Sequence, residues 1–135
     1  MALTSGFNHV ATLTTDMERI VAFYRAAFDA EVVFEMAARP DHPRMVIVDL
    51  GGGAAINIFE TTPDEIVGER GRQGRRGAID HYGLAVDSLA TLEVARDRLV
   101  AAGAEIGEIQ KLGSEWSLFF RDPDGMELEV CAHAE

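Results

Sequence analysis

FNHVATLT, residues 7–14, and IDHYGLAV, residues 79–86, are the two stretches of sequence that decide the fold. Each predicts a β-strand, and each has a histidine at its third position. His9 and His81 are 72 positions apart, so the two stretches mark the same place in two copies of one repeat.

One helix is predicted after each of these strands. In the first copy Thr15 or Asp16 is a suitable N-cap, and an apolar stripe follows at helical spacing: Met17, Ile20, Val21, Tyr24, Ala27 and Phe28. In the second copy Ser88 takes the capping position, and the stripe comprises Leu89, Leu92, Ala95, Leu99 and Val100. Gly103 suits the C-terminus of the second helix, where a positive φ is often required.

Three short strands are expected after each helix, separated by turns that glycine and proline mark. In the first copy they span residues 31–36, 44–50 and 54–59, with Gly51-Gly52-Gly53 as the last turn. In the second copy they span residues 105–112, 116–121 and 126–131, with Pro123-Asp124-Gly125 as the last turn.

The spacing between the two copies is nearly constant. Asn57 and Glu129, in the last strand of each copy, are 72 positions apart, as the two histidines are. Only the middle of the repeat drifts, because residues 104–106 match residues 30–32 at an offset of 74. The sequence therefore predicts two βαβββ modules.

We expect an α+β fold in a single domain, residues 1–135. Module one covers about residues 5–60, an arginine-rich connector about 61–77, and module two about 78–133. Because side chains alternate across a strand, helices would cover the apolar outer faces, and polar positions would line an inner concavity.

Three polar residues at these repeated positions predict a metal site. His9 and His81 lie in the first strand of each copy, and Glu129 lies in the last strand of the second copy. Two imidazoles and one carboxylate that converge on one point bind a divalent ion and leave positions open for water, dioxygen or substrate oxygens. We expect one ion per chain, which the ligands allow to be Fe²⁺, Mn²⁺, Ni²⁺, Co²⁺ or Zn²⁺.

Other polar residues are weaker candidates. Asn57 would orient the substrate or act as a weak fourth ligand, because a neutral amide oxygen binds divalent ions less well than a carboxylate does. Glu127 is the remaining candidate for a general base, although a solvated charge at the edge of the sheet is the simpler interpretation. His42 and His133 are expected to be ordinary surface residues.

Charge and composition exclude several classes of protein. The 135 residues carry a formal net charge of −11, which disfavours binding to nucleic acid. No apolar run approaches the roughly 20 residues of a membrane span, and the start MALTSGFNHV lacks the pattern of a signal peptide. Cys131 is the only cysteine, so an internal disulfide is impossible and a reducing cytoplasm is the expected location.

The segment GERGRQGRRG, residues 68–77, is the one locally basic stretch. The simpler interpretation is a flexible, solvated linker. The alternative is a mobile lid that offers arginines to an anionic substrate, and these would be Arg70, Arg72, Arg75 and Arg76.

Two segments resemble a known family. FNHVATLTTDMERIVAFYRAAF, residues 7–28, is similar to the opening of vicinal oxygen chelate (VOC) proteins, and LFFRDPDGMELEV, residues 118–130, is similar to their closing signature. That superfamily includes glyoxalase I, fosfomycin-resistance enzymes, methylmalonyl-CoA epimerase, extradiol dioxygenases and bleomycin-resistance proteins. The resemblance implies that the paired βαβββ modules form an open, cupped, eight-stranded mixed sheet, and that chains assemble as homodimers.

The resemblance also bears on the site. Metal-using members take ligands from the positions of His9, His81 and Glu129, and several take a fourth from the position of Asn57. Glyoxalase I has a glutamate at that last position, and methylmalonyl-CoA epimerase has a glutamine, so neither activity transfers directly.

Two classes of function remain open. The first is a metal-dependent enzyme, a lyase, isomerase or ring-cleaving dioxygenase, acting on a small anionic or vicinal-oxygen substrate that chelates the ion. The second is a non-catalytic protein of the bleomycin-resistance type, which binds and sequesters a small molecule.

Overall fold

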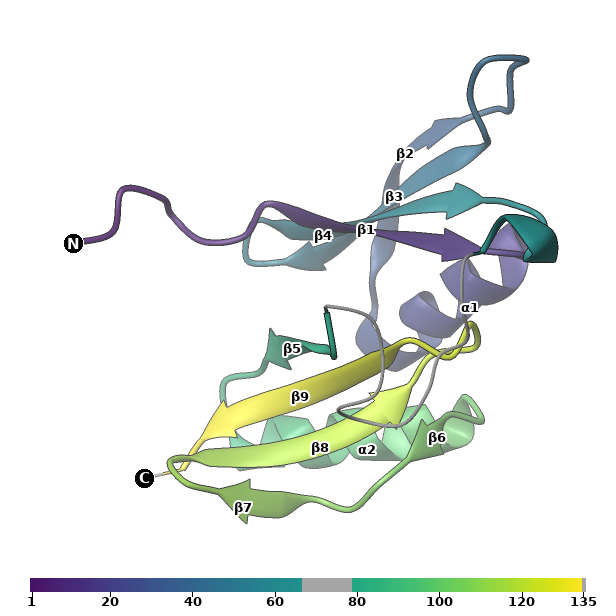
Figure 1. The fold of residues 1–135 in the computed structure, drawn as a ribbon. Coiled ribbons are helices and arrows are strands. Elements are labelled where there is room, and N and C mark those ends of the chain that lie inside the picture. The colour runs from purple at the N-terminus through teal and green to yellow at the C-terminus, as the bar shows by residue number, and fades with distance from the viewer. Residues whose placement is uncertain (67–78, 135) are drawn as a thin grey trace. The chain divides into compact units, whose positions relative to one another are not determined.

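The computed structural model describes residues 1–66 and 79–134, which fall into two compact units, one within residues 1–67 and one within residues 68–135. Each unit combines a sheet with one α-helix (Figure 1). The predicted α+β class is therefore confirmed. None of the helices in these described ranges is both long and apolar enough to cross a membrane.

The first unit follows the predicted order of elements. They are β1 (His9–Thr14), α1 (Met17–Phe28), β2 (Glu31–Met36), β3 (Met45–Gly51), β4 (Ala54–Glu60) and the short 3₁₀ helix η1 (Pro63–Glu65). The strands are ordered β1-β4-β3-β2, with β1 and β4 parallel and the other neighbours antiparallel. A parallel pair requires a crossover, which α1 and the β2–β3 hairpin provide here.

Local sequence determines both ends of α1. The side chain of Asp16 accepts a hydrogen bond from the backbone N–H of Arg19 at 3.1 Å, as an N-cap does. Glu60, at the end of β4, accepts another from the N–H of Met17 at 2.9 Å, so the sheet also caps the helix. The helix ends at Asp29, whose φ of 53° closes the last turn.

The second unit has the same order of elements, except that its edge strand is divided into two short strands. Its elements are β5 (Tyr82–Ala85), α2 (Leu89–Ala101), β6 (Glu105–Ile106), β7 (Gln110–Leu112), β8 (Glu115–Arg121) and β9 (Glu127–His133). The sheet is ordered β5-β9-β8-β6, with β7 also paired to β8, and β5 is parallel to β9. In Figure 1, α2 lies along one face of β8 and β9. Ser88 caps it by accepting from the N–H of Thr91.

Strand pairing repeats between the units with the offset that the sequence indicates. Asn57 lies opposite Ala11 and Ile47 in the first sheet, and Glu129 lies opposite Gly83 and Phe119 in the second, each partner 72 positions further on. The edge strand drifts as predicted. Residues 31–32 pair with residues 49 and 48, whereas residues 105–106 pair with residues 121 and 120. The edge strands of the two units are thus 74 positions apart, whereas the strands that they pair with are 72 positions apart.

The largest differences from the predicted strands are at the first strand of each unit and at the edge strand of the second unit. The first strands begin at His9 and Tyr82, two and three residues later than expected, so His81 precedes its strand. The single strand expected over residues 105–112 is two strands, because Gly107 donates to the carbonyl of Phe119 and the chain then leaves the ladder until Gln110. Both sheets, the four-stranded one of the first unit and the five-stranded one of the second, mix parallel with antiparallel pairs as expected.

The buried face of each sheet predicts a matched pair of destabilising substitutions. Ile56 and Leu128 occupy repeat-related positions, and each is 0% exposed. Replacing either with Ala should lower the free energy of unfolding by about 2–5 kcal/mol, because a cavity remains where the side chain packed. Urea denaturation followed by circular dichroism measures this. Val94→Ala, at an exposed position of α2, is the control, with a change of roughly 0.5 kcal/mol or less.

Candidate metal centre

The second unit brings two of the predicted ligands together. Glu129 lies on β9, His81 directly precedes β5, and these two strands are parallel neighbours. Nε2 of His81 is 3.6 Å from Oε1 of Glu129, and the two side chains are 29% and 17% exposed. An imidazole and a carboxylate are thus held together on a partly buried surface.

Asp80 determines how the ring of His81 is oriented. Its Oδ1 is 2.7 Å from Nδ1 of His81. An ionised carboxylate can only accept hydrogen bonds, so Nδ1 carries the proton, and Nε2 of the neutral ring presents a lone pair. Phe119 packs edge-to-face against the same ring, with centroids 5.1 Å apart. The ring is therefore held from two sides, with Nε2 toward Glu129.

Two lone-pair atoms consequently face each other when His81 is neutral. Such a pair is stabilised only by a positive partner, either a proton on Nε2 or a metal ion. Two ligands at about 2.1 Å from one ion lie roughly 3.0–3.4 Å apart, so the observed 3.6 Å requires only a small closure. Imidazole nitrogen with carboxylate oxygen is a donor set that suits the first-row divalent metals, and the residues fit such an ion.

Glu129 is itself held by its neighbours. Ser117, fully buried on β8, donates a hydrogen bond from Oγ to Oε2 of Glu129. Burial, and then the neighbouring carboxylate of Glu129, raises the pKa of Cys131 to about 12, so the thiol beside Glu129 remains protonated. At Gly83 an added Cβ would lie 3.9 Å from Oε1, so glycine keeps that side of the carboxylate clear.

The first unit repeats the arrangement around its own histidine. Nδ1 of His9 is 2.8 Å from Oδ1 of Asn8, and Asn8 and Asp80 are 72 positions apart. His9 and Asn57 alternate with the buried residues of their strands, so both belong to the sheet face opposite α1. Within each unit, no three His, Cys, Asp or Glu side chains of the described residues come together as a full metal site.

Two further predictions concern charged residues. Glu127 is not the solvated charge that was the simpler interpretation, because its side chain is 12% exposed and accepts from Nε of Arg121 at 3.0 Å. Adjacent strands β8 and β9 place the two residues directly opposite each other. The four candidate lid residues, Arg70, Arg72, Arg75 and Arg76, lie outside the described residues.

Sequence reasoning missed the residues that orient the ligands. Asn8 and Asp80 could have been found, because each directly precedes a repeated histidine and has a side-chain oxygen. Ser117 could not, since a lone serine in the strand Glu115–Arg121 has no counterpart in the first copy, where position 45 is methionine. Its role depends on the register between β8 and β9, which only the structure gives.

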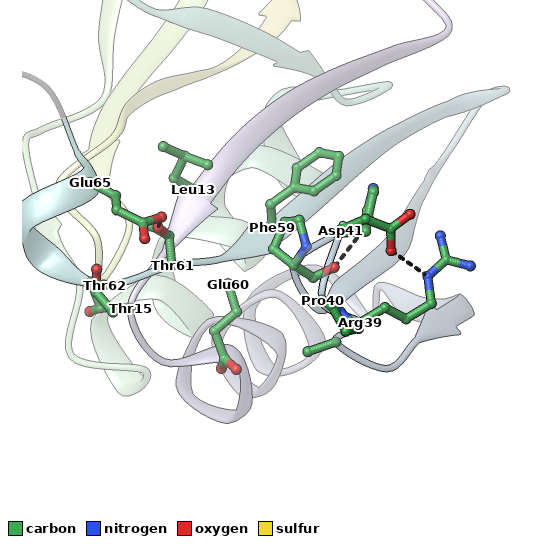
Figure 2. Close-up of a pocket in the computed structure, with 13 residues that line it drawn as sticks. Leu13, Thr15, Arg39, Pro40, Asp41, Phe59, Glu60, Thr61, Thr62 and Glu65 are labelled. Atoms are coloured by element: carbon green, nitrogen blue, oxygen red, sulfur yellow. Dashed lines mark hydrogen bonds and ion pairs between the residues drawn. The ribbon is translucent and has the colours of Figure 1, made fainter.

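A cavity of about 750 Å³ lies in the first unit (Figure 2). Leu13 and Phe59, neighbours across β1 and β4, contribute apolar side chains to its lining. Residues 39–43 form one side, where two backbone hydrogen bonds between Arg39 and His42 close the turn. His42 was expected to be an ordinary surface residue, but it lines this cavity and its ring packs against Phe59, with centroids 5.7 Å apart.

The charges around this cavity are unequal. Its lining contains one guanidinium, that of Arg39, and three carboxylates, those of Asp41, Glu60 and Glu65. Arg39 is itself 3.6 Å from Asp41. An apolar surface with an excess of negative charge favours a neutral or cationic group over an anionic one.

Comparisons with known proteins agree with this fold. A crystal structure of a glyoxylase/bleomycin resistance protein/dioxygenase domain from Frankia sp. EAN1pec is 28% identical, with a TM-score of 0.79 over 96% of this chain and 98% of that one. The fosfomycin resistance protein FosX from Listeria monocytogenes is 22% identical, with a TM-score of 0.73 over 98% and 96% of the two chains, which shows a shared fold.

Sequence comparison adds a relative and a family. The trivalent organoarsenical cleaving enzyme of Bacillus sp. (strain MD1) is 25% identical over 128 residues, covering 91% of this chain and 70% of that enzyme. The sequence pattern of one family matches residues 6–130, nearly the whole chain. This protein therefore belongs to the Glyoxalase/Bleomycin resistance protein/Dioxygenase superfamily, as its resemblance to VOC proteins predicted.

Proposed function

We propose that this protein is a metal-dependent enzyme whose small substrate binds the ion through two adjacent oxygen atoms. The observation that carries the proposal is the pair of lone-pair atoms, Nε2 of His81 and Oε1 of Glu129, 3.6 Å apart. His9 is the third ligand, and the proposal requires it to bind the same ion. Asn57 would orient the substrate or act as a weak fourth ligand.

Charge arithmetic indicates what the substrate brings to the ion. A divalent cation with one carboxylate and two neutral imidazoles keeps a net charge of +1, which favours an anionic oxygen. When bound, the ion would supply Lewis acidity toward that oxygen. The chain's own groups do the rest. Asp80 and Phe119 hold the ring of His81, and Ser117 holds Oε2 of Glu129.

The cavity suggests the character of the rest of the substrate. Leu13 is four residues from His9 along β1 and on the same face, a distance of roughly 13 Å. A substrate with its oxygens near His9 could therefore extend a neutral or cationic apolar body to Leu13 and Phe59.

Proton transfer is assigned more readily to Glu129 than to Glu127. Glu127 already accepts a hydrogen bond from Nε of Arg121 at 3.0 Å, so its carboxylate is engaged within the sheet. Glu129 has Oε1 directed to the proposed metal position, where substrate oxygens would bind. We therefore propose Glu129 as both ligand and proton acceptor, with Glu127 retained as a second candidate.

One structure with this fold contains a metal ion, and the proteins similar to this chain differ in reaction. One structure of FosX from Listeria monocytogenes, 21% identical, is of a mutant protein in complex with Mn(II) and 1S,2S-dihydroxypropylphosphonic acid. Another structure with this fold is a lactoylglutathione lyase from Agrobacterium tumefaciens, and the relative from Bacillus cleaves organoarsenicals. We propose a lyase, isomerase or ring-cleaving dioxygenase activity, in a homodimer that sedimentation equilibrium would detect.

A second function, binding and sequestration of a small molecule without chemistry, is favoured by the cavity alone. Its lining residues all belong to the first unit, and the described cavity requires neither His81 nor Glu129. A sequestering protein would keep its affinity for a ligand after the metal is removed, whereas the proposed enzyme would lose it.

Elemental analysis of purified protein tests the metal proposal. We expect about one divalent ion per chain in the wild type, and a loss of bound metal in His81→Ala and Glu129→Ala, because each removes a charged or lone-pair donor. His133→Ala is the matched control. It lies on β9 with a side chain 88% exposed, and it should retain the ion.

The opposite outcome is equally informative. A wild-type protein that takes up no metal, even after incubation with each candidate ion, would overturn the enzyme proposal and leave sequestration as the function.

The charge preference of the cavity is tested with small aromatic probes. Benzylammonium and benzyl alcohol should shift amide signals of residues 59–62 in two-dimensional NMR spectra more than benzoate does, because the lining carboxylates repel an anion. Glu65→Gln, which removes one of these charges, should reduce the difference between the probes. Stronger shifts with benzoate would contradict this assignment.

A further inference from the structure

The residue before each repeated histidine carries a side-chain oxygen that contacts Nδ1 of that histidine. In the second unit this residue is Asp80, 2.7 Å from His81, and in the first unit it is Asn8, 2.8 Å from His9. The two pairs are separated by 72 positions, as the strands that follow them are. The same side-chain contact therefore occurs in both units, and the two differ only in that one partner is a carboxylate and the other is an amide.

That difference matters for which nitrogen carries the proton. The carboxylate of Asp80 has no proton to give, so it can hold His81 only with hydrogen on Nδ1. The amide of Asn8 has an oxygen that accepts and an NH₂ group that donates. By turning over, it can pair with either tautomer of His9. The aspartate thus enforces one tautomer, whereas the asparagine only permits it.

A second consequence follows from charge. A carboxylate hydrogen-bonded to a metal-binding histidine raises the basicity of the ring, which strengthens its bond to the ion. A neutral amide raises the basicity of the ring less than a carboxylate does. His81 also has Glu129 at 3.6 Å and Phe119 against its ring, whereas His9 is exposed.

We propose that Asp80 and Asn8 are positioning residues that orient the rings of His81 and His9, and that the charge of Asp80 makes His81 the stronger of the two metal ligands. This rests on the proposed function. It implies that His81→Ala lowers metal affinity more than His9→Ala does.

The tautomers are measured in metal-free protein, which keeps this test separate from the metal proposal. At roughly pH 8, where free imidazoles are neutral, ¹⁵N and ¹³C shifts of the histidine rings report which nitrogen is protonated. We expect Nδ1 of His81 to carry a proton in all molecules, because Asp80 can only accept, and His9 to populate both neutral forms. Asp80→Asn should make His81 resemble His9, and Asn8→Asp should make His9 resemble His81.

Metal affinity, measured by competition with a chromophoric chelator, is the second readout. Asp80→Asn should weaken binding by about 10-fold, and Asn8→Asp should strengthen it severalfold. Asp97→Asn makes the same change of charge at an exposed position of α2 and should have no effect. A further variant, Asp80→Ala, removes the acceptor altogether and should move His81 toward the Nε2–H form.

Each outcome decides the inference. An unchanged His81 tautomer in both Asp80 variants, or an unchanged affinity in Asp80→Asn, would overturn it. If wild-type protein bound no metal while the tautomers changed as expected, the metal proposal and the claimed difference in ligand strength would both fail, and only the orienting of the rings would stand.

Discussion

The parallel pairing of the first and last strand in each repeat is the constraint on which the rest of the structure depends. Because β1 lies beside β4, and β5 beside β9, residues far apart along the chain become neighbours, as His9 and Ala55 do. The alternation of side chains then divides each strand between two faces. The core buries five residues of the last strands, and the positions between them are left for other side chains; the five are Ile56, Ile58, Leu128, Val130 and Ala132.

The same constraint explains why function can occupy one face without loss of stability. His81 and Ser117 both contact Glu129 on the side of the sheet that does not pack against α2. A change among them alters the chemistry of the site while the apolar face keeps its packing. This separation is consistent with a family whose members differ in reaction but share a fold.

Much of this arrangement could be predicted because each position in one copy of the repeat can be compared with the equivalent position in the other. The sequence alone indicated the repeated histidines, the capping residues Asp16 and Ser88, and the change of spacing at the edge strand. Residues whose role depends on contacts across strands were not. The ion pair of Glu127 with Arg121 and the hydrogen bond of Ser117 to Glu129 require the β8–β9 register, which no single-sequence pattern specifies. The strand boundaries failed for a related reason, because a strand ends where its ladder of hydrogen bonds ends, and that depends on the partner strand as well.

The drift of the edge strand has a consequence for how such proteins can change in length. Compared with the first copy, the second has two more residues before β6 and two fewer before β8, a full period of the strand, so inward and outward positions keep their faces. A single residue inserted within the edge strand would exchange those faces beyond the insertion. Changes of length are therefore accommodated more easily in the loops around β6 than in β9, which is fixed on both sides by β5 and β8.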